Sequence, residues 1–385
     1  MNKPKCLLLT ICAAMMLVSC SHSSESEKQT VTEPQSVSAT AQTSASTTAS
    51  QTSSASATAA STSSSTAGTT SAKPAETMPA AASADRTKPT IFTESTTVYH
   101  LAGTAFDLNN YISYGDDTDR HPRLSCTGKV DTSKPGDNPI KATVTDASGN
   151  TASHDFTVKV VTTLPKQQTP QIPSMTFDAF KARYKADNTR FGIDVSQWQG
   201  NIDFKAVKNA GCTFAFIRVG TKFSSFTLDP YFRQNLEGAL AAGLDVGVYL
   251  YTTDHTEQSA RESAKWVAAQ LGGKKLTLPV AFDWEELDGF QNYGASINDV
   301  NRAYIAFKNE LAQSGYSSML YSTEPILNSL WLESVKSTSP IWLAQYTDKP
   351  TYNGDFGIWQ VCFGRIAGIS ANTDFNVLYT NKRYK

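Results

Sequence analysis

The sequence predicts two folded parts behind an unstructured N-terminal segment: a small all-β sandwich, and then a closed β/α barrel of the α/β class. The length of 385 residues exceeds that of one ordinary domain. Residues 88–161 contain short runs in which apolar and polar side chains alternate, separated by turn residues. Residues 191–385 instead alternate apolar strand-like runs with helical patterns, which favours parallel strands joined by helices.

The overall charge gives no reason to expect a nucleic-acid partner. The chain has 34 Lys and Arg residues against 35 Asp and Glu residues, which gives a net charge of -1. Because there is no net positive field, the chain as a whole is not drawn to nucleic acid or to anionic lipid.

Residues 1–19 are interpreted as a lipoprotein signal peptide. Lys3 and Lys5 precede an apolar run over 6–18 that is short for a bilayer span. The run ends in the letters LVSC, which resemble the bacterial lipobox; this resemblance implies cleavage before Cys20 and lipidation of its thiol. An ordinary signal peptide is the alternative, and both would export the protein. We therefore expect a location at the extracellular face of the cell membrane or in the cell wall, with the lipid on Cys20 as the membrane anchor.

Residues 20–87 are predicted to form a disordered tether. Ser, Thr, Ala and Gln dominate this segment, with scattered Pro. Such a composition buries too little apolar surface to offset the entropy of ordering the chain. A flexible coil of ~65 residues spans roughly 45 Å on average, which suits a domain that works away from its anchor.

Residues 88–162 are predicted to form the sandwich. Strands are expected at 97–101, 140–145 and 155–160, with turns between them and no helical stretch. The letters VTDASGNT at 144–151 resemble a turn of bacterial immunoglobulin-like surface modules, which implies a spacer or a wall-contact element. Asp116, Asp117 and Asp119 are interpreted as an exposed acidic loop in preference to a calcium site.

Residues 163–190 are predicted to be a linker, with a short amphipathic helix at 176–185. Within 191–385, strands are predicted at 192–195, 214–219, 246–251, 278–283, 319–322, 341–346, 357–361 and 375–379. Helices are predicted at 230–242, 257–271 and 299–313, where apolar residues recur at three- and four-residue intervals. Eight such strands indicate a closed parallel barrel. Because the barrel has only about 195 residues, some helices should be short or missing.

Four acids are predicted to meet at one end of this barrel. Asp194 lies near the end of the first strand, and Asp283 and Glu285 close the fourth. Side chains two residues apart on a strand share a face, so both carboxylates should enter the same mouth. Asp374 leads into the eighth strand. Converging carboxylates suit glycoside hydrolysis, in which one acid donates a proton and another stays ionised. The alternative is a set of solvated strand-end acids.

Aromatic side chains on or near the strand ends are predicted to contact substrate. They are Tyr249, Tyr251, Tyr321, Tyr346 and Trp359. Flat rings with a polar tip suit the faces and hydroxyl groups of sugars, whereas the alternative for each ring is packing in the core.

The remaining cysteines give no metal or disulfide pattern. Cys126, Cys212 and Cys362 have no close spacing and are interpreted as small buried apolar residues, with a Cys212–Cys362 bridge as the alternative. We expect no metal, no cofactor and a monomeric chain.

Three segments together resemble glycoside hydrolase family 25, the Chalaropsis-type lysozymes or N-acetylmuramidases. They are GIDVSQWQG at 192–200, PVAFDWE at 279–285, and IWQ at 358–360 followed by TDFN at 373–376. The resemblance covers essentially all of 191–385 and implies a flattened, irregular (β/α)8-type barrel. It also implies a peptidoglycan hydrolase that cleaves the β-1,4 bond from N-acetylmuramic acid to N-acetylglucosamine in glycan strands.

The same resemblance implies a role for each acid. Glu285 would be the general acid, and Asp283 would either stabilise the oxocarbenium-like centre or orient the 2-acetamido group of the substrate. Asp194 and Asp374 would complete the acidic floor. Leu250 and Val361 depart from the family pattern, which leaves the preference among substrates open. The alternative function is a non-catalytic surface lipoprotein that binds cell-wall glycan.

Overall fold

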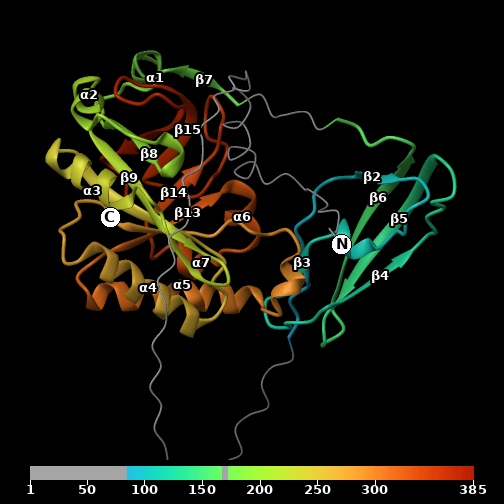
Figure 1. The fold of residues 1–385 in the computed structure, drawn as a ribbon. Helices are drawn as coiled ribbons and strands as arrows, with labels where there is room; N and C mark the ends of the chain where they lie inside the picture. Colours follow the sequence, from blue (N-terminus) through green and yellow to red (C-terminus); the bar gives the residue numbers. More distant parts are fainter. Residues whose placement is uncertain (1–84, 167–171) are drawn as a thin grey trace, which may run out of the picture. The chain divides into compact units, whose positions relative to one another are not determined.

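The computed structural model describes residues 85–166 and 172–385 (Figure 1). The predicted signal peptide, Cys20 and the predicted tether up to residue 84 lie outside these residues. Within the described ranges, no helix combines the length and the apolar character that a membrane crossing needs.

The first described part is a small β-sandwich, as predicted. Its short sheet pairs two strands, β1 (Thr90–Ile91) and β3 (Tyr114–Gly115). Its larger sheet has the order β2-β6-β5-β4. These strands are β2 (Thr97–Leu101), β4 (Arg123–Thr127), β5 (Gly136–Thr145) and β6 (Thr151–Val161). Alternate side chains of β5 and β6, such as Val144 and Val158, are fully buried in the core of the sandwich.

Two predictions for this sandwich are wrong in detail. Asp116 was expected in an exposed loop, yet it is 0% exposed, because its carboxylate turns inward to accept the backbone N–H groups of Thr118 and Asp119. Cys126 was expected to be buried, yet it is exposed on β4, an edge strand of the sheet. Cys212 and Cys362 are buried and free, so they do not form the alternative disulfide.

The end of the predicted linker is part of the second folded part. It forms β7 (Ser174–Thr176) and α1 (Phe177–Tyr184), close to the predicted helix. Phe177 and Phe180 of α1 pack against Phe375, with ring centroids 5.1 and 5.2 Å apart. These contacts attach the helix to the barrel wall.

The second part is a closed eight-stranded barrel. Its strands follow the order β8-β9-β11-β12-β13-β14-β15-β16, and pairing of β8 with both β9 and β16 closes the ring. They are β8 (Thr189–Val195), β9 (Phe214–Lys222), β11 (Asp245–Thr252), β12 (Val280–Asp283), β13 (Ser318–Thr323), β14 (Ile341–Ala344), β15 (Ile358–Arg365) and β16 (Thr373–Tyr379). A short strand, β10 (Phe226–Leu228), pairs with β9 outside the ring.

The prediction of an all-parallel barrel is wrong for the last strand. β16 runs antiparallel to both of its neighbours, β15 and β8. The connection from Arg365 to Thr373 is too short for the crossover that a parallel strand needs. The chain therefore turns back as a hairpin, and β16 starts where the other strands end.

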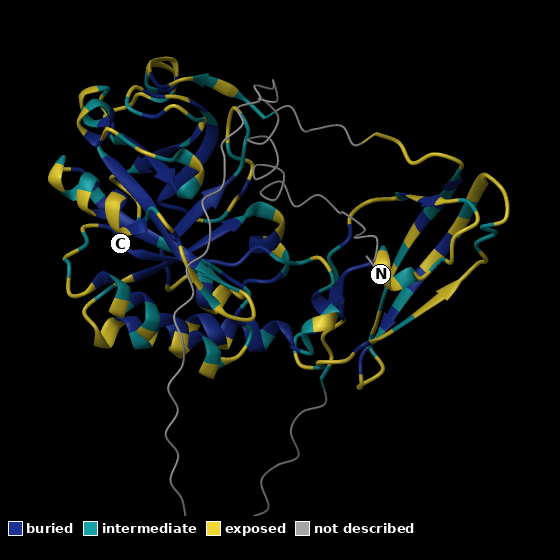
Figure 2. Ribbon diagram, viewed as in Figure 1, coloured by how far each residue is buried: buried dark blue, intermediate teal, exposed yellow. Residues whose placement is uncertain are grey.

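The helices cover the outside of the barrel, and several are short, as its small size predicted. They are α2 (Phe204–Asn209), α3 (Phe232–Ala241), α4 (Glu257–Leu271), α5 (Ile297–Gln313), α6 (Glu324–Ser329) and α7 (Glu333–Lys336). The long helices α4 and α5 lie side by side (Figure 1). Figure 2 shows that the barrel strands are buried, whereas the helices expose their outer faces.

Alternation along each strand produces two apolar layers. On β11, for example, Val248 and Leu250 face outward and pack in the layer under the helices. Inward residues such as Phe216 and Trp342, with ring centroids 4.3 Å apart, fill the interior of the barrel. This interior plug leaves inward positions near the strand ends for polar groups.

Candidate active site

The four predicted acids come together at one end of the barrel. Asp283 ends β12 and Glu285 follows it two residues later, so both lie on the inward face of the wall. Asp374, at the start of β16, lies directly opposite Asp194 of β8 in the sheet register. Because β16 runs antiparallel to β15 and β8, it starts at the end of the barrel where those two strands finish. The reversed strand therefore explains how Asp374 reaches the other acids.

Two amide side chains hold Asp194 in place. Its Oδ2 accepts hydrogen bonds from Gln360 Nε2 at 2.9 Å and from Asn376 Nδ2 at 2.8 Å. Asn376 Oδ1 in turn accepts a hydrogen bond from Trp342 Nε1 at 2.8 Å, which fixes the orientation of the amide. Burial raises the pKa of Asp194 to about 6, while the two amide donors favour the ionised form and oppose that rise.

Asp283 and Glu285 form a buried pair of neighbouring acids. Their side chains are 5% and 7% exposed. Burial, the charge of Glu285 and a side-chain hydrogen bond to Glu285 together raise the pKa of Asp283 well above its usual range. Arg218 opposes this rise only partly. The pair is therefore suited to keep a proton near neutral pH.

Asp374 is the third acid whose pKa burial raises. Burial and the charge of Asp194 raise its pKa well above the usual range, and a hydrogen bond with Tyr346 works in the opposite direction. With Asp374 and Asp194 adjacent, the two carboxyl groups disfavour simultaneous ionisation.

Arg218 does not bind one of these acids directly. Its Nε donates to Asp229 Oδ2 at 2.9 Å, and both side chains are buried. Asp229 also accepts the backbone N–H groups of Gln197 and Tyr231. The ion pair therefore secures the loop after β8, next to the site.

Four of the predicted aromatic residues lie around the acids or their supports. Tyr321 and Tyr346 both donate their hydroxyl groups to Gln360 Oε1, at 2.9 and 2.6 Å. Tyr249 faces the interior, with its ring centroid 6.2 Å from that of Trp342. The hydroxyl group of Tyr251 donates to Glu286.

The structure does not bring Trp359 to this group. It is 2% exposed and packs in the outer layer, 5.4 Å between ring centroids from Tyr184 of α1. Its Nε1 donates to the backbone oxygen of Gln345 at 2.7 Å. Since Gln360 faces inward, its strand neighbour Trp359 must face outward. The prediction that Trp359 contacts substrate is therefore wrong, and the alternative, packing in the core, is correct for this residue.

Comparison with known proteins follows the same division of the chain. Residues 193–362 match the family described as Glycosyl hydrolases family 25, and residues 91–160 match the Bacterial surface protein, Ig-like domain. Residues 193–362 belong to glycosyl hydrolases family 25. The family 25 match begins in β8 and includes Asp194, Asp283 and Glu285, whereas Asp374 follows its last residue.

Individual relatives are similar over the same part. The chain is 31% identical over 206 residues to Lysozyme M1 of Streptomyces globisporus, covering 48% of this chain and 66% of that protein. It is 27% identical over 187 residues to an autolytic lysozyme of Clostridium acetobutylicum, covering 48% of this chain and 54% of that protein. The chain thus spans between half and two thirds of the length of these two relatives. A solved bacterial lysozyme from Streptomyces coelicolor is 27% identical, with a TM-score of 0.45, over 51% of this chain and 94% of that chain.

Sequence reasoning did not assign a role to Gln360 or Asn376. Both lie in the segments that carry the resemblance, but only the acids were selected there. Asn376 follows Asp374 by two residues on β16, so the alternation that joined Asp283 to Glu285 also predicts it inward. The hydrogen bonds from these two amides to Asp194 could not be predicted, because they depend on the register of β15, β16 and β8.

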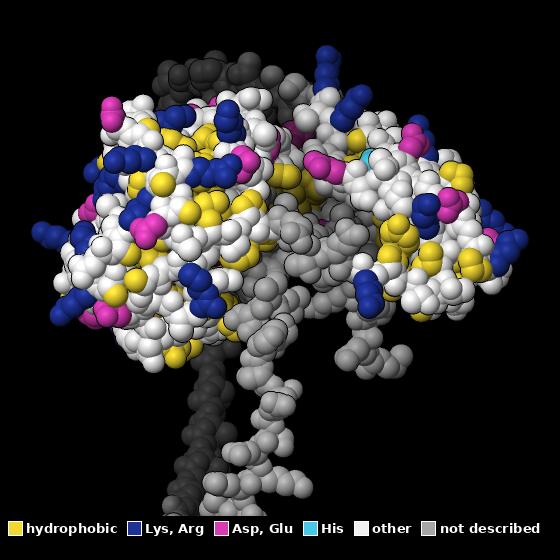
Figure 3. Space-filling view, turned by 90° about the horizontal axis from the view of Figure 1, so that it is seen from above, with side chains coloured by type: hydrophobic (Ala, Val, Ile, Leu, Met, Phe, Trp, Pro, Cys, Tyr) yellow, Lys and Arg dark blue, Asp and Glu magenta, His cyan; other side chains and the backbone are white. Residues whose placement is uncertain are grey.

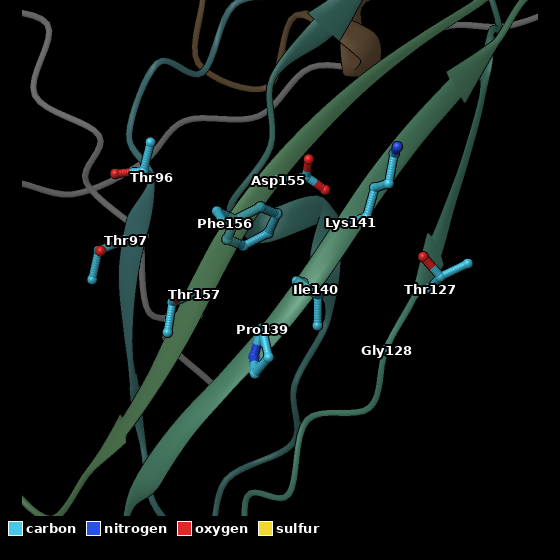
Figure 4. A pocket seen from close by; sticks show the side chains of 10 residues that line it. All are labelled: Thr96, Thr97, Thr127, Gly128, Pro139, Ile140, Lys141, Asp155, Phe156 and Thr157. Carbon is cyan, nitrogen blue, oxygen red and sulfur yellow. The ribbon is translucent and has the colours of Figure 1, made fainter.

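The open hollow on the sandwich and the charges on the face drawn in Figure 3 suggest no ligand by themselves. An open hollow of about 720 Å³ lies on the sandwich. Four threonines line it together with Gly128, Pro139, Ile140 and Phe156, and Lys141 and Asp155 are its charged residues (Figure 4). On the face drawn in Figure 3, basic and acidic side chains are interspersed. This pattern agrees with the near-zero net charge.

Proposed function

We propose that this chain is a peptidoglycan hydrolase of the lysozyme type, an N-acetylmuramidase. The substrate would be the glycan strand, and the bond cleaved would be the β-1,4 link from N-acetylmuramic acid to N-acetylglucosamine. The observation that carries the proposal is the buried pair Asp283 and Glu285 at the end of β12, in the same barrel mouth as a separately supported Asp194. Family 25 membership and similarity to two named lysozymes support the same chemistry.

Glu285 would be the general acid that protonates the leaving glycosidic oxygen. Its pair with Asp283 keeps a proton available in a buried site, which a general acid near neutral pH requires. Once substrate enters, the proton would reside on Glu285 and pass to the oxygen as the bond breaks. Asp194, held ionised by its two amide donors, would stabilise the positive charge that develops on the sugar ring.

Asp283 has two roles open to it, and its position on the same strand end as Glu285 favours one of them. The carboxyl groups of a retaining pair that flank the reacting bond lie about 5 Å apart or more. Asp283 and Glu285 lie two residues apart at the end of one strand, so both approach a bound sugar from the same side. We therefore favour Asp283 as the group that orients the 2-acetamido group of the substrate, over a direct charge-stabilising role across the sugar.

The chain would act outside the cell, close to the producing cell. The lipobox-like letters before Cys20 and the match to a bacterial surface Ig-like domain support export and a membrane anchor. The sandwich would serve as a spacer or a wall-contact element. If most of the protein is found free in culture supernatant, the anchor on Cys20 is wrong.

The decisive experiment compares peptidoglycan digestion by residues 21–385 of the wild type, Glu285→Gln and Glu262→Gln. Glu262 is exposed on α4, so its variant makes the same charge change away from the acids. Mass spectrometry should identify fragments with a reducing muramic acid end from the wild type and from Glu262→Gln. For Glu285→Gln we expect a rate lower by on the order of 100- to 10,000-fold, the usual contribution of a general acid. If the wild type pellets with cell walls but releases nothing, the protein is a glycan-binding module.

A further inference from the structure

Three carboxylates from three separate segments of the Ig-like sandwich converge on one point. Asp85 precedes β1, Asp116 follows β3, and Asp146 follows β5. One carboxylate oxygen of each lies within 4.8 Å of the others. A fourth acid, Asp117, lies beside them: after burial, the charges of Asp116 and Asp85 are what raise its pKa.

A second observation, buried carboxylate oxygens that accept no hydrogen bond, points to a ligand at this cluster. Asp116 is 0% exposed, and its Oδ2 is buried with no hydrogen-bond partner. Its other oxygen already accepts the backbone N–H groups of Thr118 at 3.0 Å and Asp119 at 2.7 Å. Asp117 Oδ1 is likewise buried and without a hydrogen bond.

The cluster also lacks a compensating positive charge. Across residues 85–166 and 172–385, no salt bridge joins Asp85, Asp116, Asp117 or Asp146 to a Lys, Arg or His side chain. Asp116 and Asp146 are buried, and buried carboxylates this close to another acid are costly to ionise without a counter-charge. A bound cation would supply that counter-charge.

We propose that Asp85, Asp116 and Asp146 bind a divalent cation, calcium, in the sandwich. The available ligands are oxygens alone, the ligand type that calcium prefers. Calcium–oxygen distances of about 2.3–2.6 Å place ligands on opposite sides of the ion roughly 5 Å apart, which agrees with the 4.8 Å limit of the cluster. The proposal revises the sequence-based expectation that the chain has no metal site.

One side of the site is already held in position by the turn at residues 146–150. Asp146 Oδ1 accepts the backbone N–H of Asn150 at 2.8 Å, and its Oδ2 accepts Asn150 Nδ2 at 2.7 Å. Asn150 Nδ2 also donates to the backbone oxygen of Asp85 at 3.2 Å, which ties the first segment to this turn. Ligands supplied by three separate loops suit the adaptable geometry of calcium better than the strict octahedron of magnesium.

The test is a calcium titration of residues 21–385 after removal of divalent ions with a chelator. Calorimetry should give one calcium site with a Kd on the order of 0.1–1 mM, the range of extracellular calcium modules, and weaker binding of magnesium. The melting temperature should rise by about 5 °C between chelator and 5 mM calcium chloride. Asp116→Asn should weaken calcium binding by about tenfold or more, since it removes a charged ligand.

Asp155→Asn is the matched control, because Asp155 is exposed on β6 of the same sandwich. It should bind calcium as the wild type does. Asp116→Asn keeps an acceptor for Thr118 and Asp119 and relieves charge repulsion, so without calcium it should be at least as stable as the wild type. If Asp116 merely shapes its loop, the variant will instead be less stable with and without calcium.

Asp85→Asn provides a second variant at a half-buried position, should Asp116→Asn fail to fold. It too should weaken calcium binding. The proposal is overturned if the folded wild type shows neither saturable calcium binding nor a calcium-dependent melting temperature at millimolar concentrations. Equal affinity for magnesium would overturn the assignment to calcium.

Discussion

Replacing Asn376 tests most directly whether Asp194 is the acid that stays ionised in the site. Asn376 Nδ2 donates to Asp194, and Asn376 Oδ1 accepts from Trp342 Nε1. In Asn376→Ala, Asp194 keeps only the hydrogen bond from Gln360. If ionised Asp194 assists hydrolysis, the loss of a donor should make Asp194 easier to protonate and should reduce activity first at low pH.

The magnitude follows from the strength of one hydrogen bond to a charged group. Such a bond contributes about 1.5–3 kcal/mol, and about 1.4 kcal/mol corresponds to one pH unit. The pKa of Asp194 is about 6 in the intact site. The acidic limb of the kcat/KM profile, which Asp194 should govern, is therefore expected to move upward by about one to two pH units. The orphaned donor of Trp342 should also lower the free energy of unfolding by roughly 1–3 kcal/mol.

The assay is the pH profile of peptidoglycan digestion from pH 4 to 9, together with urea unfolding. Asn301→Ala is the matched control: Asn301 is 2% exposed in α5 and donates to the backbone oxygens of Ile297 and Leu330, so it is as buried and as bonded as Asn376. We expect it to lower stability without moving the profile. A profile for Asn376→Ala that superimposes on that of the wild type would refute the role given to Asp194.

Two further predictions concern the energetic cost of the site. Because the pKa of Asp283 is higher in the folded than in the unfolded chain, its contribution to stability is fully present below pH 4 and is lost as the pH rises through the folded pKa. Asp283→Asn should therefore melt at a higher temperature than the wild type at pH 7.5, with a smaller difference at pH 4.5; lower stability at both pH values would contradict this. Asp229→Asn should lower the free energy of unfolding by roughly 3–5 kcal/mol, because Arg218 is then left buried without its partner. Urea unfolding measures this, and a loss below about 1 kcal/mol would mean that water reaches Arg218.

A site residue could be predicted where the pattern of a single strand decides which way its side chain faces. It could not be predicted where the arrangement of several strands decides this. Asp283 and Glu285 follow a single buried strand, and alternation alone places them on one face. Trp359 lies within a buried strand, β15, and the apolar run around it gives no alternation that decides which of its residues face inward. The direction of β16 was equally hidden, because strand patterns do not encode whether neighbours run parallel.

The sandwich gives a similar lesson about acidic loops. Asp116, Asp117 and Asp119 are close in sequence, which favoured a solvated loop. The structure instead combines Asp116 with Asp85 and Asp146, which are distant in sequence. When three separate segments each supply one ligand, the ligands show no characteristic spacing in the sequence. Such a cation site can be recognised only in the folded chain.

The placement of Gln360 and Asn376 explains how one site can hold two kinds of acid. Burial raises the pKa of Asp194, Asp283 and Asp374, and so favours the neutral form of each. The amides of Gln360 and Asn376 both donate to Asp194, and they favour its ionised form. On the other side Asp283 has Glu285 as its neighbour, and their repulsion favours a retained proton. Acid chemistry and charge stabilisation can thus coexist at one pH because the hydrogen-bond donors lie on one side of the barrel mouth.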